Sequence, residues 1–322
     1  MTRLIAFGEA LVDMLSSRLG TSSAQETFTP YAGGAPANVA VACARLGVPS
    51  LFVGMLGRDR FGDFILEELS SHGVDVSHVT RTDEAKTALA FVSRDASGER
   101  RFDFYRPPSA DLLYRPEHLP SDLFDADSIL HLCSNTLTET DITATTFAVA
   151  ERAAAAGALI SVDANIRANL WPKHRVDTAR ITALLDKAQL IKLASEELEL
   201  LRGAASEESY LQARLASGAA LIVITDGGEP VTAVTAHSRM RVAPPKVRVV
   251  DTTAAGDAFI GGLLSRLVDA RLTRDTLPAW ASDEARMRES LEFATRCGAF
   301  TVTRPGSYAA LPRREDLAAL RS

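Results

Sequence analysis

The hydrophobic positions of the chain fall into short runs that alternate with amphipathic segments. Six runs, several of them almost wholly apolar, predict strands at 4–14, 50–57, 128–134, 158–165, 190–195 and 220–228. Such runs are typical of strands buried on both faces of a parallel sheet. Most of them end in Gly, Ser, Asp or Asn, as strands that lead into functional loops often do.

The segments between these runs carry helical periodicity. Val39, Cys43 and Leu46 are spaced i, i+4, i+7, with Pro36 suited to a first helical position and Gly47 to the residue past the end. The same reasoning predicts helices at 36–47, 61–73, 255–270 and about 284–300. The alternation of β and α units predicts a three-layer α/β fold with a mainly parallel sheet.

The region from about 79 to 106 departs from this alternation. TALAFVSRD and RRFDFYR are β-rich runs with no helix between them, and Asp95, Ser97 and Gly98 supply turn residues. We expect a hairpin that joins the run at 27–32 in a small sheet, acting as a lid over a pocket. An edge hairpin of the main sheet is the alternative. The expected organisation is one domain, 1–322, with a discontinuous lid from about 15–32 and 79–106.

Composition narrows the functional classes. The chain has 322 residues, 35 Lys+Arg and 41 Asp+Glu, which gives a formal net charge of −6. This balance argues against a nucleic-acid-binding protein. No run approaches the roughly 18 apolar residues of a membrane span, and Gly8, Glu9 and Asp13 interrupt the N-terminal run, unlike a signal peptide. Three distant cysteines predict no disulfide framework, so we expect a cytoplasmic protein.

The stretch VVDTTAAGDAFIGGLL (249–264) carries candidate chemistry. A β-rich run stops at Asp251, small residues follow, and an amphipathic helix begins near Gly256 and Asp257. Backbone N–H groups at a helix N-terminus bind anions, and Asp257 would place a carboxylate beside them. Phosphoryl transfer to an alcohol needs this pairing of an anion cradle and a base. An ordinary helix start with Asp in its first turn is the alternative, and no P-loop motif occurs.

A second stretch, YAGGAPANVAVACARLG (31–47), places Gly33 and Gly34 before a helix whose first turn carries Asn38. Bare backbone beside an amide suits a polyhydroxylated ligand. A simple glycine turn with normal helix entry is the alternative reading.

Together, GGAPAN (33–38) and DTTAAGDAF (251–259) closely resemble the two signatures of the ribokinase-like (PfkB) sugar kinases, in the same order and separation. The resemblance spans essentially the whole chain. It includes GMLGRDRFG (54–62), FYRPPSAD (104–111), DANIRANLW (163–171), KLASEELELL (192–201) and TVTRPGSYAALP (301–312). GEALVDML (8–15), FYR and the DANIR–LW stretch look most like bacterial fructokinases.

The resemblance implies roles around the transferred phosphoryl group and the sugar. Asp257 matches the catalytic base, and Ala254, Ala255 and Gly256 match the anion hole. The family's commonest form has Gly at position 254, so Ala there implies that this residue need not adopt a left-handed conformation. The matched sugar contacts are Asp13, Gly33, Gly34 and Asn38, with Arg106 and Arg167 as further active-site groups. A surface salt bridge is the alternative for one of the two arginines.

On the nucleotide side the resemblance implies contacts to ATP and ions. Lys192, Glu197, Thr225 and Gly227 match, with Glu197 organising Mg²⁺ through water, and Cys297 and Gly298 walling the adenine pocket. Ala194 stands where the family has Asn or Ser, and Ser195 could compensate. The positions Asp251, Thr253, Thr301, Arg304 and Gly306 match those where many relatives bind K⁺.

These matches predict an ATP-dependent kinase that phosphorylates a primary hydroxyl of a ketohexose, D-fructose above others. Three alternatives stay open. They are a 2-keto-3-deoxygluconate kinase, which would use Arg106 and Arg167 for a sugar-acid carboxylate, a non-catalytic sugar- or nucleotide-binding protein, and a dinucleotide-dependent oxidoreductase. The last lacks GxGxxG after the first strand. A homodimer through the lid sheets is a further expectation, since a copy readily completes a hairpin edge.

Overall fold

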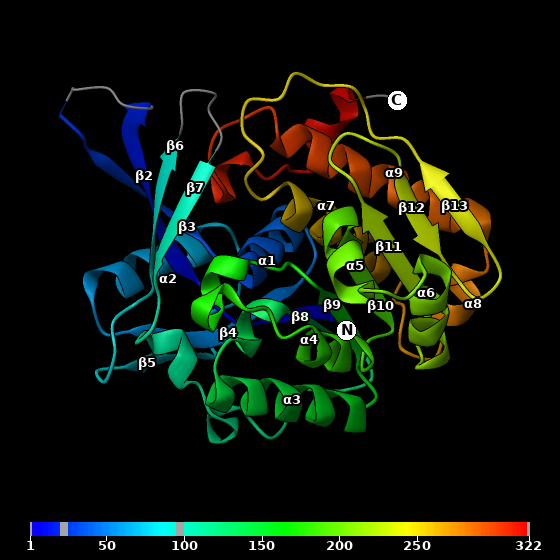
Figure 1. Ribbon diagram of the computed structural model, residues 1–322, viewed down its shortest axis with the longest axis horizontal. Coiled ribbons are helices and arrows are strands. Elements are labelled where there is room, and N and C mark those ends of the chain that lie inside the picture. The colour runs from blue at the N-terminus through cyan, green and yellow to red at the C-terminus, as the bar shows by residue number, and fades with distance from the viewer. Residues whose placement is uncertain (1, 20–24, 95–99, 321–322) are drawn as a thin grey trace.

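A nine-stranded sheet forms the centre of the molecule in the computed structural model, which describes residues 2–19, 25–94 and 100–320 (Figure 1). Neighbouring strands are parallel from β11 to β5, and β12 and β13 add an antiparallel edge. Their order is β13 (Arg239–Val242), β12 (Val231–Val234), β11 (Leu221–Thr225), β10 (Leu190–Ala194), β9 (Leu159–Asp163), β8 (Ser128–Cys133), β1 (Arg3–Phe7), β4 (Ser50–Gly57) and β5 (Val79–Thr82).

Helices cover both faces of this sheet. One face carries α3 (Thr140–Ala155), α4 (Thr178–Leu185), α5 (Ser195–Arg202) and α6 (Glu207–Ala216). The other carries α1 (Ala35–Arg45), α2 (Arg60–Ser71), α7 (Ala255–Asp269), α8 (Leu277–Ala281) and α9 (Glu284–Thr301). In β8, Ile129 packs toward one layer and Leu130 toward the other. The predicted three-layer α/β fold is therefore confirmed.

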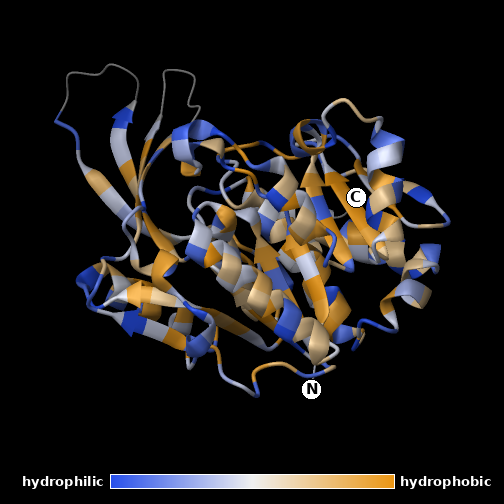
Figure 2. Ribbon diagram, turned by 60° about the horizontal axis from the view of Figure 1, so that its bottom comes forward, coloured by the Kyte–Doolittle hydropathy of each residue, from blue (hydrophilic) through white to orange (hydrophobic). Residues whose placement is uncertain are grey.

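Hydrophobic side chains follow this layering. The strands at the middle of the sheet are buried along their whole length, including all of β8 and β9. Figure 2 shows the hydrophobic colour concentrated in the central strands and the polar colour in outer helices and loops. Burial on both faces explains why these strands read as continuous apolar runs rather than as alternating ones.

A separate four-stranded sheet stands beside the main one, at the left of Figure 1. Its order is β3 (Phe28–Gly33), β2 (Leu11–Leu19), β6 (Leu89–Arg94) and β7 (Arg100–Tyr105). The predicted hairpin is β6 with antiparallel β7, and the expected small sheet is confirmed. The expected turn residues Asp95, Ser97 and Gly98 lie outside the described residues. The expected lid range from 79 includes β5, but β5 pairs with β4 in the main sheet, so this half of the lid begins at Leu89.

The first apolar run is two strands, not the single strand expected at 4–14. β1 lies in the main sheet and β2 in the small sheet, and the chain crosses between them at 8–10. A Cβ built on Gly8 would lie 2.6 Å from Cγ of Pro36, so the crossing passes tightly over the start of α1. Gly8 and Glu9 mark this break in the sequence, but apolar residues resume at once on the far side, because each of the two sheets buries its own part of the run. The consequence is that Asp13 belongs to the lid.

Candidate active site

The predicted site residues gather where the parallel strands end. Lys192 is the middle residue of β10, Asp257 is in the first turn of α7, and Asn165, which sequence reasoning did not single out, follows β9. Carboxyl ends of neighbouring parallel strands meet at one edge of a sheet, where ligands of open α/β folds bind. Gly33 and Asn38 reach the same edge from the junction of the lid with α1.

The turn before α7 holds Ala254 in the left-handed conformation, with φ 57° and ψ 12°. The expectation that Ala254 need not adopt this conformation is therefore wrong. The turn requires it because the chain must reverse from the loop after Asp251 directly into the helix. In the described chain the N–H groups of Ala254 and Gly256 have no backbone acceptor, whereas the N–H of Ala255 lies 3.3 Å from the carbonyl oxygen of Thr252. These free donors and the helix dipole make this turn an anion-binding element.

Asp257 is a buried carboxylate held by two amides. Nδ2 of Asn38 donates to its Oδ2 at 2.7 Å, and Nδ2 of Asn165 donates to its Oδ1 at 3.3 Å. The pKa of Asp257 is raised to about 6, chiefly by burial and in smaller part by Asp163, while the Asn38 hydrogen bond, Lys192 and Arg167 act in the opposite direction. A carboxylate with this pKa is mostly ionised at neutral pH yet can accept a proton, as a general base must.

Two residues that sequence reasoning did not single out complete this cluster. Asp163 forms a buried ion pair with Lys192, at 3.0 Å between Oδ2 and Nζ. Asn165 has a φ of 39°, a left-handed value that Asn tolerates better than most residues. Both lie in the DAN triplet after β9, and a polar triplet at the end of an apolar strand is the signal that could have found them.

Lys192 was matched to the nucleotide side, and the structure places its ammonium group beside the anion turn. A Cβ built on Gly256 would lie 3.0 Å from Nζ of Lys192. Burial alone lowers the pKa of Lys192, but Asp163 and Glu197 raise it, so the net shift is upward and the group stays charged. A fixed positive charge therefore lies next to the turn that begins α7.

The glycine pair lies against the lid and the chain crossing. A Cβ on Gly33 would lie 2.6 Å from Oδ2 of Asp13, and one on Gly34, whose φ is 104°, would lie 2.6 Å from the carbonyl oxygen of Glu9. At Gly34 only glycine fits, because the close atoms are backbone, whereas a side chain at Gly33 would displace the Asp13 carboxylate. Tyr308, which sequence reasoning did not single out, donates its hydroxyl hydrogen to the carbonyl oxygen of Gly33 at 3.3 Å. Burial and the nearby Asp13 raise the pKa of the Tyr308 phenol, so it stays protonated.

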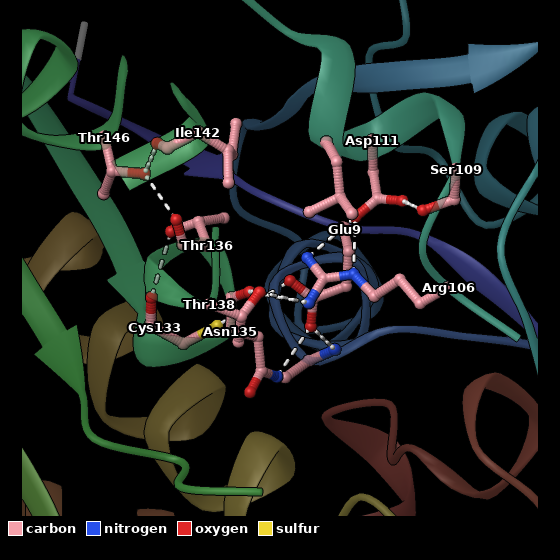
Figure 3. A network of polar contacts seen from close by, with 12 residues as sticks. Glu9, Arg106, Ser109, Asp111, Cys133, Asn135, Thr136, Thr138, Ile142 and Thr146 are labelled. Carbon is pink, nitrogen blue, oxygen red and sulfur yellow. Dashed lines mark hydrogen bonds and ion pairs between the residues drawn. The ribbon is translucent and has the colours of Figure 1, made fainter. Parts of the chain in front are cut away.

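The two predicted arginines occupy different surroundings. Arg106 is 1% exposed and forms an ion pair with Asp111 at 2.7 Å, while its Nη1 donates to the carbonyl of Asn135 at 2.6 Å. Figure 3 shows its guanidinium between Asp111, Glu9 and Asn135. A surface salt bridge is thus excluded for Arg106. Arg167 is exposed, and its charge reaches Asp257.

Glu197 joins two strand ends. Its Oε1 accepts from the N–H of Ile166 at 2.6 Å, and its Oε2 from the N–H of Ala194 at 2.7 Å. Burial raises the pKa of this carboxyl. Ala194 caps α5 without a side-chain bond, and Ser195 donates to Asp226 at 2.8 Å rather than to the helix start. Glu197 therefore satisfies the N–H of the N-cap residue Ala194 and keeps further lone pairs on both oxygens.

The remaining nucleotide-side positions are partly open. Gly227 has a φ of 51° and nothing within 4 Å of a built Cβ, and the hydroxyl of Thr225 lies 3.4 Å from the carbonyl of Leu193. A Cβ on Gly298 would lie 3.3 Å from the carbonyl of Ala255. Cys297 is completely buried, and its Sγ would lie 2.8 Å from a Cβ on Gly262 of α7. Cys297 therefore packs α9 against α7, with no surface of its own facing a ligand.

The positions matched to a potassium site lie in two loops that meet. Asp251 accepts from the N–H and hydroxyl of Thr253 at 3.0 and 2.8 Å, and from the N–H of Gly306 at 2.9 Å. The hydroxyl of Thr301 instead donates to the carbonyl of Cys297, and Arg304 lies over the ring of Phe300 at 4.0 Å.

Within the described ranges no group of three or more His, Cys, Asp and Glu side chains is arranged to hold a metal ion. No helix in these ranges is long and apolar enough to span a membrane.

Comparisons with known proteins agree with this geometry. A family model, pfkB family carbohydrate kinase, matches residues 1–314. Probable fructokinase-4 of Arabidopsis thaliana is 39% identical over 319 residues, 98% of this chain and 96% of that protein. Fructokinase from Xylella fastidiosa with bound ATP has a TM-score of 0.93 and 42% identity, over 99% of this chain and 97% of that one. Fructokinase from Vibrio cholerae O395 with fructose, ADP and calcium has a TM-score of 0.87 and 33% identity, over 100% and 99%.

Proposed function

This chain belongs to the pfkB family of carbohydrate kinases, and from that premise we propose that it is an ATP-dependent fructokinase. The observation that carries the proposal is the Asp257 carboxylate, buried and held by two amides beside the anion turn of α7. The fructokinases of similar sequence and structure support fructose as the sugar and ATP as the donor.

Asp257 takes the proton of a primary sugar hydroxyl in this proposal. Asn38 and Asn165 fix the carboxylate so that a free lone pair on an oxygen points at the hydroxyl, and the hydroxyl oxygen then attacks the γ-phosphorus in line. Asp13, Gly33 and Gly34 bind the other hydroxyls from the lid side, since a carboxylate and open backbone can accept and donate to them. The lid covers the sugar and excludes water, which would otherwise accept the phosphoryl group.

Negative charge that develops on the transferring group meets three positive elements. They are the free N–H groups before α7, the ammonium of Lys192 and the exposed guanidinium of Arg167. Stabilisation of charge by preorganised donors is usually the largest contribution in such transfers. Arg167 is exposed, and we place its guanidinium on the phosphates or a sugar oxygen when both substrates are bound.

Mg²⁺ accompanies ATP in this proposal, and Glu197 fits it through water. Each carboxylate oxygen of Glu197 accepts one backbone N–H and has a further lone pair. This lone pair can accept a hydrogen bond from a water molecule of the Mg²⁺ ion, which usually keeps several waters in proteins. When bound, Mg²⁺ neutralises the phosphate oxygens. For K⁺, the hydrogen bond from Gly306 to Asp251 brings the two matched loops together beside a buried carboxylate. Replacing K⁺ by choline should lower turnover, and unchanged turnover would remove the ion from the proposal.

The sugar-acid alternative loses support at Arg106. A 2-keto-3-deoxygluconate kinase would use Arg106 and Arg167 to pair the substrate carboxylate. The guanidinium of Arg106 is instead taken by Asp111 and the Asn135 carbonyl, away from solvent. Only Arg167 is then free to meet a sugar acid, which favours the neutral ketohexose.

The test is coupled ADP release by the purified protein with MgATP and K⁺ across fructose, 2-keto-3-deoxygluconate, ribose, glucose and adenosine. We expect turnover on fructose to exceed every other substrate by at least tenfold in kcat/KM. Preference for the sugar acid would keep the kinase chemistry and reject fructokinase. Sugar or ATP binding with no turnover on the whole panel would reject the kinase and favour a binding protein.

We also propose a cytoplasmic homodimer through the lid. Three buried free cysteines suit a reducing compartment. On the lid, Phe28 and Tyr105 both pack on Phe91, with ring centroids 5.1 Å apart in each pair, yet are 39% and 63% exposed. Such an exposed aromatic row suits a second copy. Sedimentation velocity should show a dimer that Tyr105→Asp converts to monomer, and a wild-type monomer at micromolar concentration would reject it.

A further inference from the structure

A second, basic cavity lies away from Asp257, where the C-terminal ends of α1 and α2 meet the segment at 313–315. Its volume is about 390 Å³, within the range of small-molecule sites. It shares no lining residue with the site described above. The lining residues are Ala44, Arg45, Leu46, Gly47, Ser71, His72, Gly73, Arg313, Arg314 and Glu315.

Two of the three arginines in this cavity have no partner. Within residues 2–19, 25–94 and 100–320, the guanidinium groups of Arg45 and Arg313 make no hydrogen bond and no ion pair. Arg314 differs, because it donates to the carbonyl of Leu46 and pairs with Asp269 at 2.6 Å. Arg314 therefore builds the wall, and the other two guanidiniums stay available to a ligand.

His72 adds a third group with spare hydrogen-bonding capacity. Its ring packs edge-on against Tyr308, with centroids 5.8 Å apart, and its Nε2 has no partner in the described chain. Glu315 is the one acidic side chain among the described lining residues, and it is exposed. Three arginines and one glutamate leave a net positive cavity.

The like charges in this cavity oppose one another. Burial lowers the pKa of Arg45, and the neighbouring Arg313 lowers it further, with Asp316 and Glu315 only partly offsetting this. A half-buried guanidinium without an acceptor loses hydrogen bonds to water and makes none to the protein, which costs free energy. A bound anion would relieve both the repulsion and the missing hydrogen bonds, and the planar fork of arginine matches phosphate oxygens in particular.

We propose that this cavity is a binding site for a phosphoryl anion, either free phosphate or a small phosphomonoester, held by Arg45 and Arg313 with His72 beside them. The site is separate from the anion turn of α7 and does not depend on the proposed fructokinase activity. The cavity has room for more than the phosphoryl group, because 390 Å³ exceeds the volume of a phosphate several times.

The test must report on this cavity alone, since the anion turn of α7 also attracts phosphate. His72 supplies the readout, because its imidazole NMR signals are identified by their loss in His72→Gln. Inorganic phosphate and glucose 6-phosphate are titrated separately into the full-length wild-type protein, with NaCl at matched ionic strength as the control. We expect a saturable shift of the His72 signals with at least one phosphate probe and none with NaCl.

Arg45→Ala and Arg313→Ala should each weaken this binding at least tenfold. Arg175→Ala, an exposed arginine just before α4 on the opposite face of the sheet, should leave it unchanged. Tighter binding of glucose 6-phosphate identifies a phosphomonoester as the ligand, and equal binding identifies free phosphate. No saturable shift with either probe, or the wild-type affinity in both cavity variants, would overturn the proposal. Arg313 is exposed, so its variant keeps the test available if Arg45→Ala does not fold.

Discussion

Two buried clusters near the junction of the lid and the main sheet each hold an aspartate carboxylate, but the groups that bind the carboxylate differ in charge. In one, amides of Asn38 and Asn165 hold the carboxylate of Asp257. In the other, the guanidinium of Arg106 holds the carboxylate of Asp111 (Figure 3). Amides bind a carboxylate without neutralising it, so burial still raises the pKa of Asp257 to about 6. A guanidinium neutralises its partner and fixes both groups.

The difference separates a group that can exchange a proton from groups that hold the fold. Burial alone lowers the pKa of Arg106, but Asp111 and Glu9 reverse this, so the net shift is upward. The Arg106 guanidinium therefore stays charged and bound to the Asp111 carboxylate. The chain enters the lid beside Glu9 and leaves it beside Arg106, so this cluster fixes the lid's attachment.

Asp257→Asn should lower kcat by roughly 10²–10⁴-fold, the range for loss of a positioned general base. The folded state should not suffer, because the ionised carboxylate is disfavoured by burial and a neutral amide is not. Coupled ADP release and thermal melting measure the two effects. Asp122→Asn, at an exposed position in the segment before β8, serves as the matched control and should keep wild-type kcat. Near-normal turnover by Asp257→Asn would contradict the assignment of the base.

Arg106→Met should instead act on stability, lowering the free energy of unfolding by about 3–5 kcal/mol, as when one partner of a buried ion pair is removed. Arg167→Met, at an exposed position, should change that free energy by less than about 0.5 kcal/mol and lower kcat or raise KM. Urea unfolding and steady-state kinetics separate the two. If Arg106→Met were fully stable and defective only in sugar affinity, Arg106 would be a substrate contact after all.

Ala254→Gly should produce the smallest change. A left-handed Ala costs about 1–2 kcal/mol, and Gly removes this strain. Gly also loses more conformational entropy on folding, which costs about 0.5–1 kcal/mol, so the variant should be more stable by about 0.5–1 kcal/mol. Ala255→Gly, one residue later and inside the helix, should lose about 0.5 kcal/mol. Chemical denaturation of both variants compares them, and destabilisation of Ala254→Gly by as much as Ala255→Gly would show that no strain is stored at the turn.

The sequence predicted the architecture because apolar runs and helical spacing are local signals. The strands at 50–57 and 128–134 and the helices that start near Ala35 and Ala255 lie where expected. The change of sheet at 8–10 was missed because both sheets bury apolar residues, so the interruption at Gly8 and Glu9 did not show that the two halves pair with different strands. The edge assignment of β5 was missed for a related reason, since pairing partners are set by tertiary structure rather than by pattern.

The site was predicted less evenly. Asp257 and Asn38 were found from motifs, and the structure joins them by one hydrogen bond. Asn165 and Asp163 were not named, because their roles depend on which strand ends lie side by side. Arg106 could not be distinguished from Arg167 by sequence, since burial beside Asp111 is a property of the folded chain. The conformation of Ala254 was misjudged because residue type alone does not fix φ in a turn that surrounding structure imposes.

The pH dependence of kcat/KM for fructose shows whether Asp257 is the general base, because it reports the ionisation of the base in the free enzyme. Asp257 acts when ionised, so kcat/KM should be level above its pKa of about 6 and fall tenfold per pH unit below it. Asn38→Ala removes a hydrogen bond that favours the ionised form, and should therefore move the break to higher pH. A profile with no break between pH 5 and 8, or a break that Asn38→Ala leaves in place, would show that Asp257 is not the general base.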